Sequence, residues 1–196
     1  MIVIIKYNGG NTASVANALE SFGYKYIITD NPDKILKADK VIFPGQGRAG
    51  SAMQSLNSKD LDKTLQQIKQ PFLGICLGMQ LLFSFSEEDD IKCLNIIKGK
   101  VKRFTGKNLK IPQIGWNNLK QKQKSPLFKN VPDNAYVYFV NSYFVSANTK
   151  LTSASYKYGN VRPAAIVQKN NFYGVQFHPE KSGKAGRQIL KNFLEL

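Results

Sequence analysis

One of the two cysteines in this sequence stands where nucleophilic chemistry is favoured. Cys76 lies between Gly74 and Gly78. An apolar run with the length of a buried strand, Phe72–Ile75, precedes it, and a second apolar run, residues 79–85, continues at helical length. A strand that passes directly into a helix needs small residues at the turn, and such a turn lifts the thiol to the helix N-terminus. Peptide dipoles favour the reactive thiolate there.

The composition leaves one candidate for a histidine base that could work with this thiol. His178 is the only histidine in the chain, so no other imidazole can serve Cys76. Pro179 fixes the turn after it, and Glu180 follows where its carboxylate can hydrogen-bond the ring and hold its tautomer. Structural interpretations remain open, with Cys76 as a small buried hydrophobe and His178 as a polar group that ends a strand.

A glycine-rich loop, residues 44–50, follows the apolar run Lys40–Phe43. It contains G-x-G-x-x-G, which in dinucleotide-binding proteins follows the first strand of a βαβ unit, with an acidic residue about 20 positions on. Here the pattern follows the third expected strand and a proline, and the next strand ends in Ile75-Cys76, so we reject that interpretation. The loop can instead present backbone N–H groups to a developing negative charge, as an oxyanion site.

The elements that must position these residues alternate between strand and helix in the first half of the chain. This rhythm predicts an α/β fold with a mainly parallel sheet. The second half has shorter strands separated by Gly, Pro and Asn, which indicate an antiparallel or mixed sheet within one domain, residues 1–196, closed by an amphipathic helix. The expected strands are 3–6, 24–29, 40–43, 72–75, 100–104, 136–140, 153–158, 164–168 and 172–177, and the main expected helices are 15–22, 33–36, 51–56 and 184–196.

Composition limits the environment and the partners. The chain has 28 Lys and Arg against 13 Asp and Glu, a net charge of +15, but its lysines are spread along the sequence. A lysine-rich composition is enough to explain this charge, so we expect no nucleic-acid partner, although an acidic or phosphorylated surface would fit it. The two cysteines lack metal-ligand spacing, and no apolar run approaches the roughly 20 residues of a membrane span. We expect a reduced, cytoplasmic protein without metal, cofactor or membrane partner.

Taken together, the cysteine elbow, the Pro-Gly-x-Gly loop and the late His-Pro-Glu resemble the class I glutamine amidotransferases. Four further stretches narrow this resemblance to the glutaminase subunits of imidazole glycerol phosphate synthases, over essentially the whole chain. The resemblance implies a three-layer fold with helices on both faces of the central sheet and an added antiparallel sheet. The stretches are Ile4-Ile5-Lys6-Tyr7-Asn8, Gly115-Trp116-Asn117, Tyr138-Phe139-Val140-Asn141-Ser142-Tyr143 and Phe177-His178-Pro179-Glu180-Lys181-Ser182-Gly183.

The resemblance also implies a reaction. Cys76 would attack the side-chain amide of glutamine and form a γ-glutamyl thioester. His178 would take the thiol proton and later give it to ammonia, and Glu180 would orient His178. The remaining implied residues form three groups. The oxyanion would be met by Gly45, Gln46, Gly47 and Leu77; glutamine would be bound by Gln80, Glu88, Asn141, Ser142 and Tyr143; and a partner would be contacted by Asn11, Trp116, Tyr138 and Lys181.

That implied partner is a cyclase subunit of (βα)₈-barrel fold, bound as a heterodimer. It would use the ammonia to make imidazole glycerol phosphate and AICAR in histidine biosynthesis. The sequence departs from the family pattern at Lys6, often Asp, at Asn141, usually His, and at Arg48, a long cation beside the oxyanion loop. Asn141 cannot titrate, so contacts to glutamine at this position can differ.

Two other functions compete with this one. A paralogous glutaminase subunit could feed ammonia to a different synthase, such as one that amidates surface sugars. A regulatory or nucleic-acid-binding protein could have kept the fold, and its Cys76 would then be unreactive toward glutamine-like electrophiles.

Overall fold

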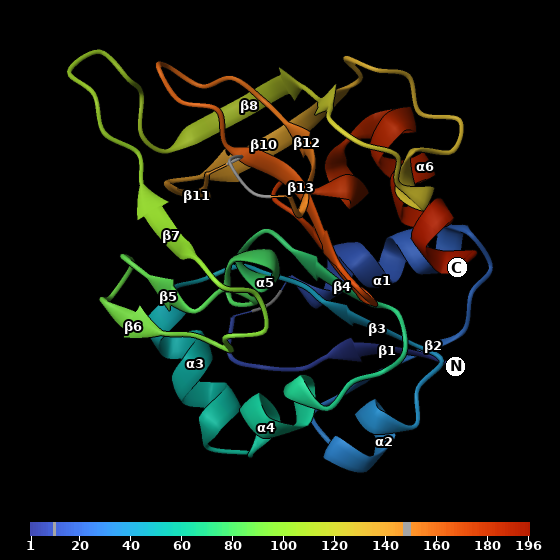
Figure 1. The fold of residues 1–196 in the computed structure, drawn as a ribbon. Helices are drawn as coiled ribbons and strands as arrows, with labels where there is room; N and C mark the ends of the chain where they lie inside the picture. Colours follow the sequence, from blue (N-terminus) through green and yellow to red (C-terminus); the bar gives the residue numbers. More distant parts are fainter. Residues whose placement is uncertain (10, 147–149) are drawn as a thin grey trace.

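The computed structural model describes residues 1–9, 11–146 and 150–196 (Figure 1). Its described strands include a central sheet of eight, in the order β2-β1-β3-β4-β14-β13-β12-β9. The neighbouring strands from β2 to β14 run parallel, whereas β13, β12 and β9 are antiparallel. The bounds are β1 (Ile2–Ile5), β2 (Tyr26–Thr29), β3 (Lys40–Phe43), β4 (Phe72–Ile75), β9 (Lys120–Gln121), β12 (Thr152–Ser155), β13 (Ala164–Lys169) and β14 (Phe172–Val175).

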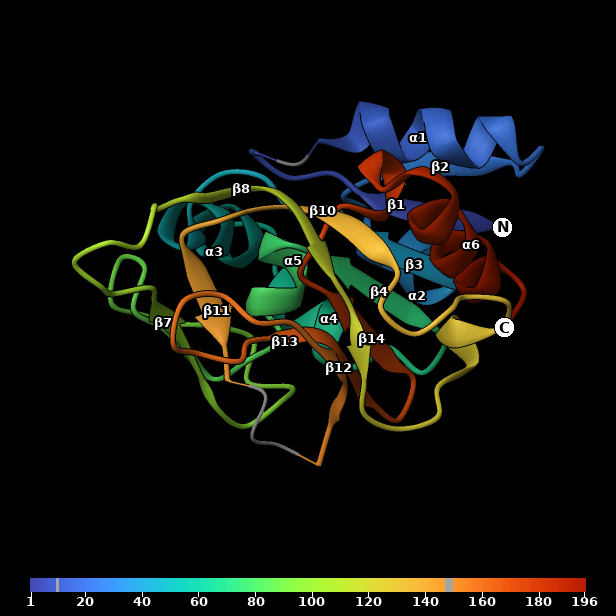
Figure 2. The same ribbon diagram turned by 90° about the horizontal axis from the view of Figure 1, so that it is seen from above.

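Helices cover both faces of this sheet because its central strands are apolar on both sides. In β1, Ile4 belongs to a core cluster that also contains Leu19 and Ile189, whereas Ile5 belongs to one that contains Leu56. Figures 1 and 2 show α1 and α6 on one side and α2, α3 and α4 on the other. The bounds are α1 (Thr12–Ser21), α2 (Pro32–Leu36), α3 (Ala49–Asn57), α4 (Leu61–Gln66) and α6 (Gly183–Leu194).

Two smaller sheets lie over the carboxyl ends of the parallel strands. One pairs β8 and β10 in antiparallel fashion, and the other has the order β11-β7-β5-β6. Figure 1 shows β8 and β10 above α5 (Leu77–Gln80). The bounds are β5 (Phe85–Ser86), β6 (Ile91–Lys92), β7 (Lys100–Arg103), β8 (Gln113–Asn118), β10 (Tyr136–Asn141) and β11 (Tyr143–Val145), with 3₁₀ turns η1 (Pro126–Phe128) and η2 (Pro179–Lys181). The predicted α/β fold with helices on both faces and added antiparallel sheet is confirmed.

The apolar run after Cys76 is a correction to the sequence-based expectation. The predicted continuation as a helix over residues 79–85 is wrong, because α5 ends at Gln80. The next carbonyl groups bind a distant segment instead: Leu81 O accepts from Leu94 N–H at 3.0 Å, and Leu82 O from Ile97 N–H at 2.8 Å. Tertiary hydrogen bonds therefore replace those of a longer helix. Helix α4 was not predicted, and the strands expected to reach residues 158 and 177 end at Ser155 and Val175.

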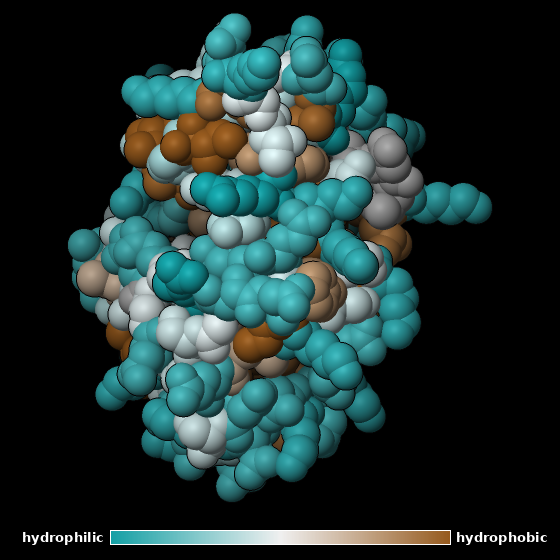
Figure 3. Space-filling view, turned by 90° about the vertical axis from the view of Figure 1, so that its left-hand side faces the viewer, coloured by the Kyte–Doolittle hydropathy of each residue, from teal (hydrophilic) through white to brown (hydrophobic). Residues whose placement is uncertain are grey.

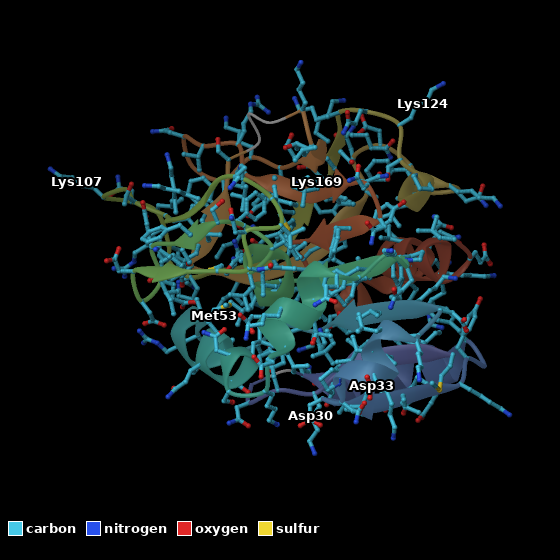
Figure 4. All side chains as sticks on the ribbon, turned by 60° about the horizontal axis from the view of Figure 1, so that its bottom comes forward. Asp30, Asp33, Met53, Lys107, Lys124 and Lys169 are labelled. Atoms are coloured by element: carbon cyan, nitrogen blue, oxygen red, sulfur yellow. The ribbon has the colours of Figure 1, made fainter. Side chains whose placement is uncertain are left out.

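The labelled lysine side chains lie far apart on the molecule (Figure 4). In Figure 4, Lys107 and Lys124 extend from distant edges of the molecule, and Lys169 lies between them. The positive charge is thus spread over the surface, as the lysine distribution in the sequence indicates. In the parts of the chain that the structure describes, no helix is long and apolar enough to cross a membrane.

Candidate active site

Cys76 occupies a strained elbow between β4 and α5. Its φ of 52° and ψ of −108° lie outside the regions that L-residues normally adopt. Its N–H donates to Val175 O at 2.7 Å, which ties the elbow to β14. The flanking glycines allow close backbone approach, since a Cβ on Gly78 would lie 2.2 Å from Phe43 O and one on Gly74 would lie 2.6 Å from Gly78 O. The sequence-based reason for these glycines agrees with this packing.

The loop after β3 lies directly against the elbow. A Cβ on Gly45 would lie 2.3 Å from Ile75 O and 2.5 Å from Leu77 N, so only glycine fits there. Tyr7, just after β1, donates its hydroxyl hydrogen to Pro44 O at 2.9 Å and lies 3.3 Å from Gln46 O. Burial raises the pKa of Tyr7, which keeps its hydroxyl protonated. Tyr7 was not among the predicted site residues, although it lies in the stretch Ile4-Ile5-Lys6-Tyr7-Asn8 that contributed to the resemblance.

His178 and Glu180 form a buried pair at the end of β14. His178 Nδ1 lies 2.9 Å from Glu180 Oε1, and the two side chains are only 5% and 1% exposed. The other carboxylate oxygen, Oε2, has no hydrogen-bond partner among the described residues. The turn is anchored to β10, because the His178 N–H donates to Tyr138 O at 3.0 Å and Ser182 Oγ accepts from Tyr138 N–H at 2.9 Å. The imidazole therefore has little freedom to rotate.

The protonation of His178 depends on both neighbours. Burial by itself lowers the pKa of His178, but hydrogen bonds to Cys76 and Glu180, together with their charges, raise it overall to about 10. An imidazole with this pKa holds a proton at neutral pH, which it can pass on to a leaving group. The ring thus lies between an acceptor on its Nδ1 side and the thiol, which is the arrangement of a nucleophile, a base and an orienting carboxylate.

These residues open into a cavity of about 570 Å³. It contains every residue that the sequence predicted for catalysis, the oxyanion site and glutamine binding, except Glu180, which is buried behind the Nδ1 edge of the ring. Four other residues, two of them from the predicted partner set, complete its wall. The lining residues are Gly45, Gln46, Gly47, Cys76, Leu77, Gln80, Glu88, Pro112, Tyr138, Val140, Asn141, Ser142, Tyr143, His178 and Lys181.

An acidic segment, Glu88 and Asp89, holds the rim of the cavity near the start of α3. Glu88 Oε2 accepts from Ala49 N–H at 2.9 Å, and partial burial raises the pKa of the Glu88 carboxyl. Asp89 Oδ2 accepts from Gly50 N–H at 2.9 Å and forms an ion pair with Arg48. Arg48, 72% exposed, is therefore a surface cation that ties the oxyanion loop to this segment.

The structure adds a site residue that the sequence analysis did not single out. Gln176 is fully buried, and its Nε2 lies 3.6 Å from Cys76 Sγ. The available signal was its position in the predicted strand 172–177, two residues before His178, because alternate side chains of a strand share a face. Cys76 Sγ also lies 3.7 Å from Val140 O.

The residues predicted to contact a partner lie in different places. Trp116 on β8 is 55% exposed and meets Tyr138 on β10 edge-on, with ring centroids 5.9 Å apart. Tyr138 and Lys181 line the cavity, so these two residues join its mouth to the outer face of the β8–β10 sheet. Asn11 instead caps α1, accepting from Ser14 N–H at 3.2 Å, and does not line the cavity.

Comparison with known proteins identifies the class. A family profile described as "Glutamine amidotransferase class-I" matches residues 3–196, and the chain belongs to this family. It is 46% identical to "Imidazole glycerol phosphate synthase subunit HisH" of Idiomarina loihiensis over 100% of this chain and 97% of that protein. It is 48% identical to the protein of the same name from Methanosarcina mazei, covering 100% and 98% of the two chains. The resemblance inferred from the sequence is confirmed.

Solved structures agree on the fold. The chain resembles a putative GMP synthase subunit from Thermoplasma acidophilum, with a TM-score of 0.76 and 19% identity, covering 100% of this chain and 92% of that one. It also resembles PurLQS from Thermotoga maritima, with a TM-score of 0.71 and 17% identity, covering 99% and 97%. At these identities the likeness concerns the fold alone.

Proposed function

We propose that this chain is the glutaminase subunit of imidazole glycerol phosphate synthase in histidine biosynthesis, and that Cys76, His178 and Glu180 carry its reaction. One observation carries the proposed chemistry: the sole histidine is buried, its Nδ1 lies 2.9 Å from Glu180 Oε1, and its pKa is raised by the neighbouring Cys76 at the strained elbow as well as by Glu180. Sequence identity of 46–48% over the full chain to proteins of that name supports the pathway.

In the first half of the reaction the sulfur of Cys76 attacks the side-chain carbonyl carbon of glutamine. A C–S bond forms, the thiol proton moves to His178, and the carbonyl electrons become an oxyanion. The N–H of Leu77 and the loop at Gly45–Gly47 are the donors proposed to stabilise this charge. When the C–N bond breaks, His178 gives its proton to the leaving nitrogen, which departs as ammonia and leaves a γ-glutamyl thioester.

In the second half water attacks the thioester carbon. His178 takes a proton from the water as the C–O bond forms, and the resulting intermediate collapses with cleavage of the C–S bond. The proton returns to sulfur, and glutamate leaves. Glu180 accepts from the Nδ1 side throughout, so the Nε2 atom remains available to sulfur and water.

The cavity wall offers hydrogen-bond acceptors for the α-amino group of glutamine. The Glu88 carboxylate at the rim suits the α-amino group, and Gln80 presents Oε1, because its Nε2 already donates to Tyr143 O at 3.0 Å and to Gln176 Oε1 at 2.9 Å. Asn141 Nδ2 likewise donates to Tyr143 O at 2.9 Å, which holds the segment through Ser142 in the wall.

The proposed partner is a cyclase subunit of (βα)₈-barrel fold, docked on the outer face of the β8–β10 sheet. Exposed apolar side chains gather there: Ile114, Trp116, Tyr136 and Val140 are 58%, 55%, 63% and 37% exposed. Figure 3 shows a hydrophobic patch at the height at which β8 and β10 lie in Figure 1. Apolar groups gathered on a sheet are typical of interaction surfaces. Ammonia released beside Tyr138 would leave at this face.

The test combines activity with covalent labelling. The purified chain is assayed for glutamine hydrolysis alone and with the cyclase and its nucleotide ligand, and a glutamine-mimicking diazo-ketone is applied to the complex. We expect negligible activity alone, strong stimulation in the complex, and an adduct on Cys76 that is absent from Cys76→Ser. Free hydrolysis that no cyclase affects would contradict the proposed client, and an adduct elsewhere would contradict the mechanism.

A further inference from the structure

Two buried glutamine side chains connect the nucleophile to the backbone of β11. Gln80 Nε2 donates to the carbonyl oxygen of Tyr143 at 3.0 Å and to Gln176 Oε1 at 2.9 Å. Gln176 Nε2 in turn donates to Cys76 Sγ at 3.6 Å, within the range of hydrogen bonds to sulfur. Gln80 is 5% exposed and Gln176 is fully buried. The connection therefore lies inside the protein, away from competing water.

The chemistry of the acceptors fixes the direction of these bonds. A backbone carbonyl can only accept, so the atom of Gln80 that faces Tyr143 O must be its amide nitrogen. That nitrogen has a second hydrogen, which reaches Gln176, so the atom of Gln176 on that side must be its oxygen. The amide nitrogen of Gln176 then faces sulfur. The orientation of both amides thus follows from one main-chain group.

A thiolate accepts this hydrogen bond better than a thiol does. Sulfur in a neutral thiol is a weak acceptor, whereas a hydrogen bond to an ionised acceptor is roughly twice as strong as one between neutral groups. In the described residues the amide nitrogen of Gln176 has no other hydrogen-bond partner, and burial gives it no water. Its donor is therefore best satisfied when Cys76 carries the negative charge.

On the basis of the proposed function, we infer that Gln176 is a further catalytic residue, which donates a hydrogen bond to the sulfur of Cys76 and favours its thiolate form. Gln80 is the positioning residue that keeps this donor turned toward sulfur. Gln80 then has two separate roles, since its nitrogen orients Gln176 and its Oε1 is left for glutamine. The base, His178, and the donor, Gln176, stand two residues apart, just after β14.

The other titratable groups around the sulfur do not supply this effect. Tyr7 and Tyr156 both interact with Cys76, but burial raises the pKa of each phenol, so both stay neutral. Tyr156 is also hydrogen-bonded by Asn141 Nδ2 at 3.2 Å. His178, backed by Glu180, is the one charged group that contacts the thiol among the described residues. A variant of Gln176 leaves all of these in place.

The decisive variant is Gln176→Met, which keeps the side-chain length and removes the donor. Iodoacetamide reacts with thiolates, so its rate at Cys76, followed by peptide mass spectrometry from neutral to alkaline pH, reports the ionised fraction. We expect the rate at neutral pH to fall about tenfold and to approach that of the wild type at alkaline pH. In the complex, kcat should fall about 10- to 100-fold, because the lost donor acts on sulfur. KM for glutamine should change little, because Gln80 keeps its bond to Tyr143 O.

Two further variants separate this effect from a loss of folding. Gln176→Glu still accepts from Gln80 but turns an acceptor toward sulfur, so its alkylation at neutral pH should fall further than that of Gln176→Met. The matched control is Gln168→Met on the adjacent strand, which removes bonds of Gln168 to Ser125 and Tyr173 and lines no part of the cavity. It should alkylate and turn over as the wild type does.

The outcomes are distinguishable. If Gln176→Met and Gln176→Glu fold and alkylate with the wild-type pH profile, the inference is overturned while the proposed function stands. A lower melting temperature with an unchanged profile shows a structural role only and overturns it equally. If the wild-type complex takes up no diazo-ketone at Cys76, the proposed function fails, and the inference fails with it.

Discussion

Replacing Gly45 with alanine tests how closely the oxyanion loop must approach the nucleophile. An added Cβ would lie 2.3 Å from Ile75 O, 2.4 Å from Gly78 N and 2.5 Å from Leu77 N. All three atoms belong to the backbone of the elbow, so no flexible side chain can move aside. Ordinary van der Waals contact begins at 3.4 Å, and the loop or the elbow must therefore move by about 1 Å.

That displacement sets the expected magnitude. Inserting one methyl group into a packed interior costs about 1–3 kcal/mol of unfolding free energy, which for a chain of this size lowers the melting temperature by about 2–4 °C per kcal/mol. A misplacement of about 1 Å at reacting groups costs about 100-fold in rate. The Gly45→Ala variant should thus lose about 100-fold in kcat/KM and remain folded at room temperature.

The assay measures glutamine hydrolysis in the cyclase complex together with thermal unfolding. Gly23→Ala is the matched control, since a Cβ there meets nothing within 4 Å and its φ of +77° costs only about 1 kcal/mol. It should lose stability but keep its activity per folded molecule. If Gly45→Ala retains wild-type activity, or loses no more than Gly23→Ala, the proposed placement of the oxyanion loop is refuted.

Three other substitutions give further predictions. Glu180→Gln removes a charge that raises the pKa of His178, so kcat should fall about 10- to 100-fold and the alkaline limit of the fold should move to lower pH. The sign follows because the raised pKa of His178 stabilises the folded state below pH 6.5, and this stabilisation is lost as the pH rises through about 10. Denaturant titrations across pH measure it, and the same pH dependence in Glu180→Gln and the wild type would show that the pair does not contribute. Ile114→Asp should weaken cyclase binding, measured by calorimetry, at least tenfold, whereas Ile28→Asp, a control at an exposed position of the edge strand β2, should bind as the wild type does. Arg48→Ala removes an exposed ion pair, so the free energy of unfolding should change little while KM for glutamine rises a few-fold. An unchanged KM would show that the pair does not hold the cavity rim.

The sequence by itself determined the chemistry and the order of the main elements. A single histidine limited the possible base, and the buried apolar runs Lys40–Phe43 and Phe72–Ile75 were predicted with their observed bounds. Local patterns were sufficient there because a short, mainly apolar run between turn residues has few alternatives to a buried strand. The glycines at the elbow were also explained in advance, since a direct strand-to-helix turn restricts residue size wherever it occurs.

Only the tertiary structure decided which distant groups meet at the sulfur. The length of α5 depended on hydrogen bonds from residues 94–97, and no local pattern records them. Tyr7, Gln176 and the tight fit of Gly45 are likewise contacts between chain segments brought together by the pairing of β1, β3, β4 and β14. A glutamine or tyrosine has the same appearance in a sequence whether it faces solvent or is buried against a thiol. Its role is set by what packs against it, because the low dielectric of the interior makes each unshared hydrogen bond count.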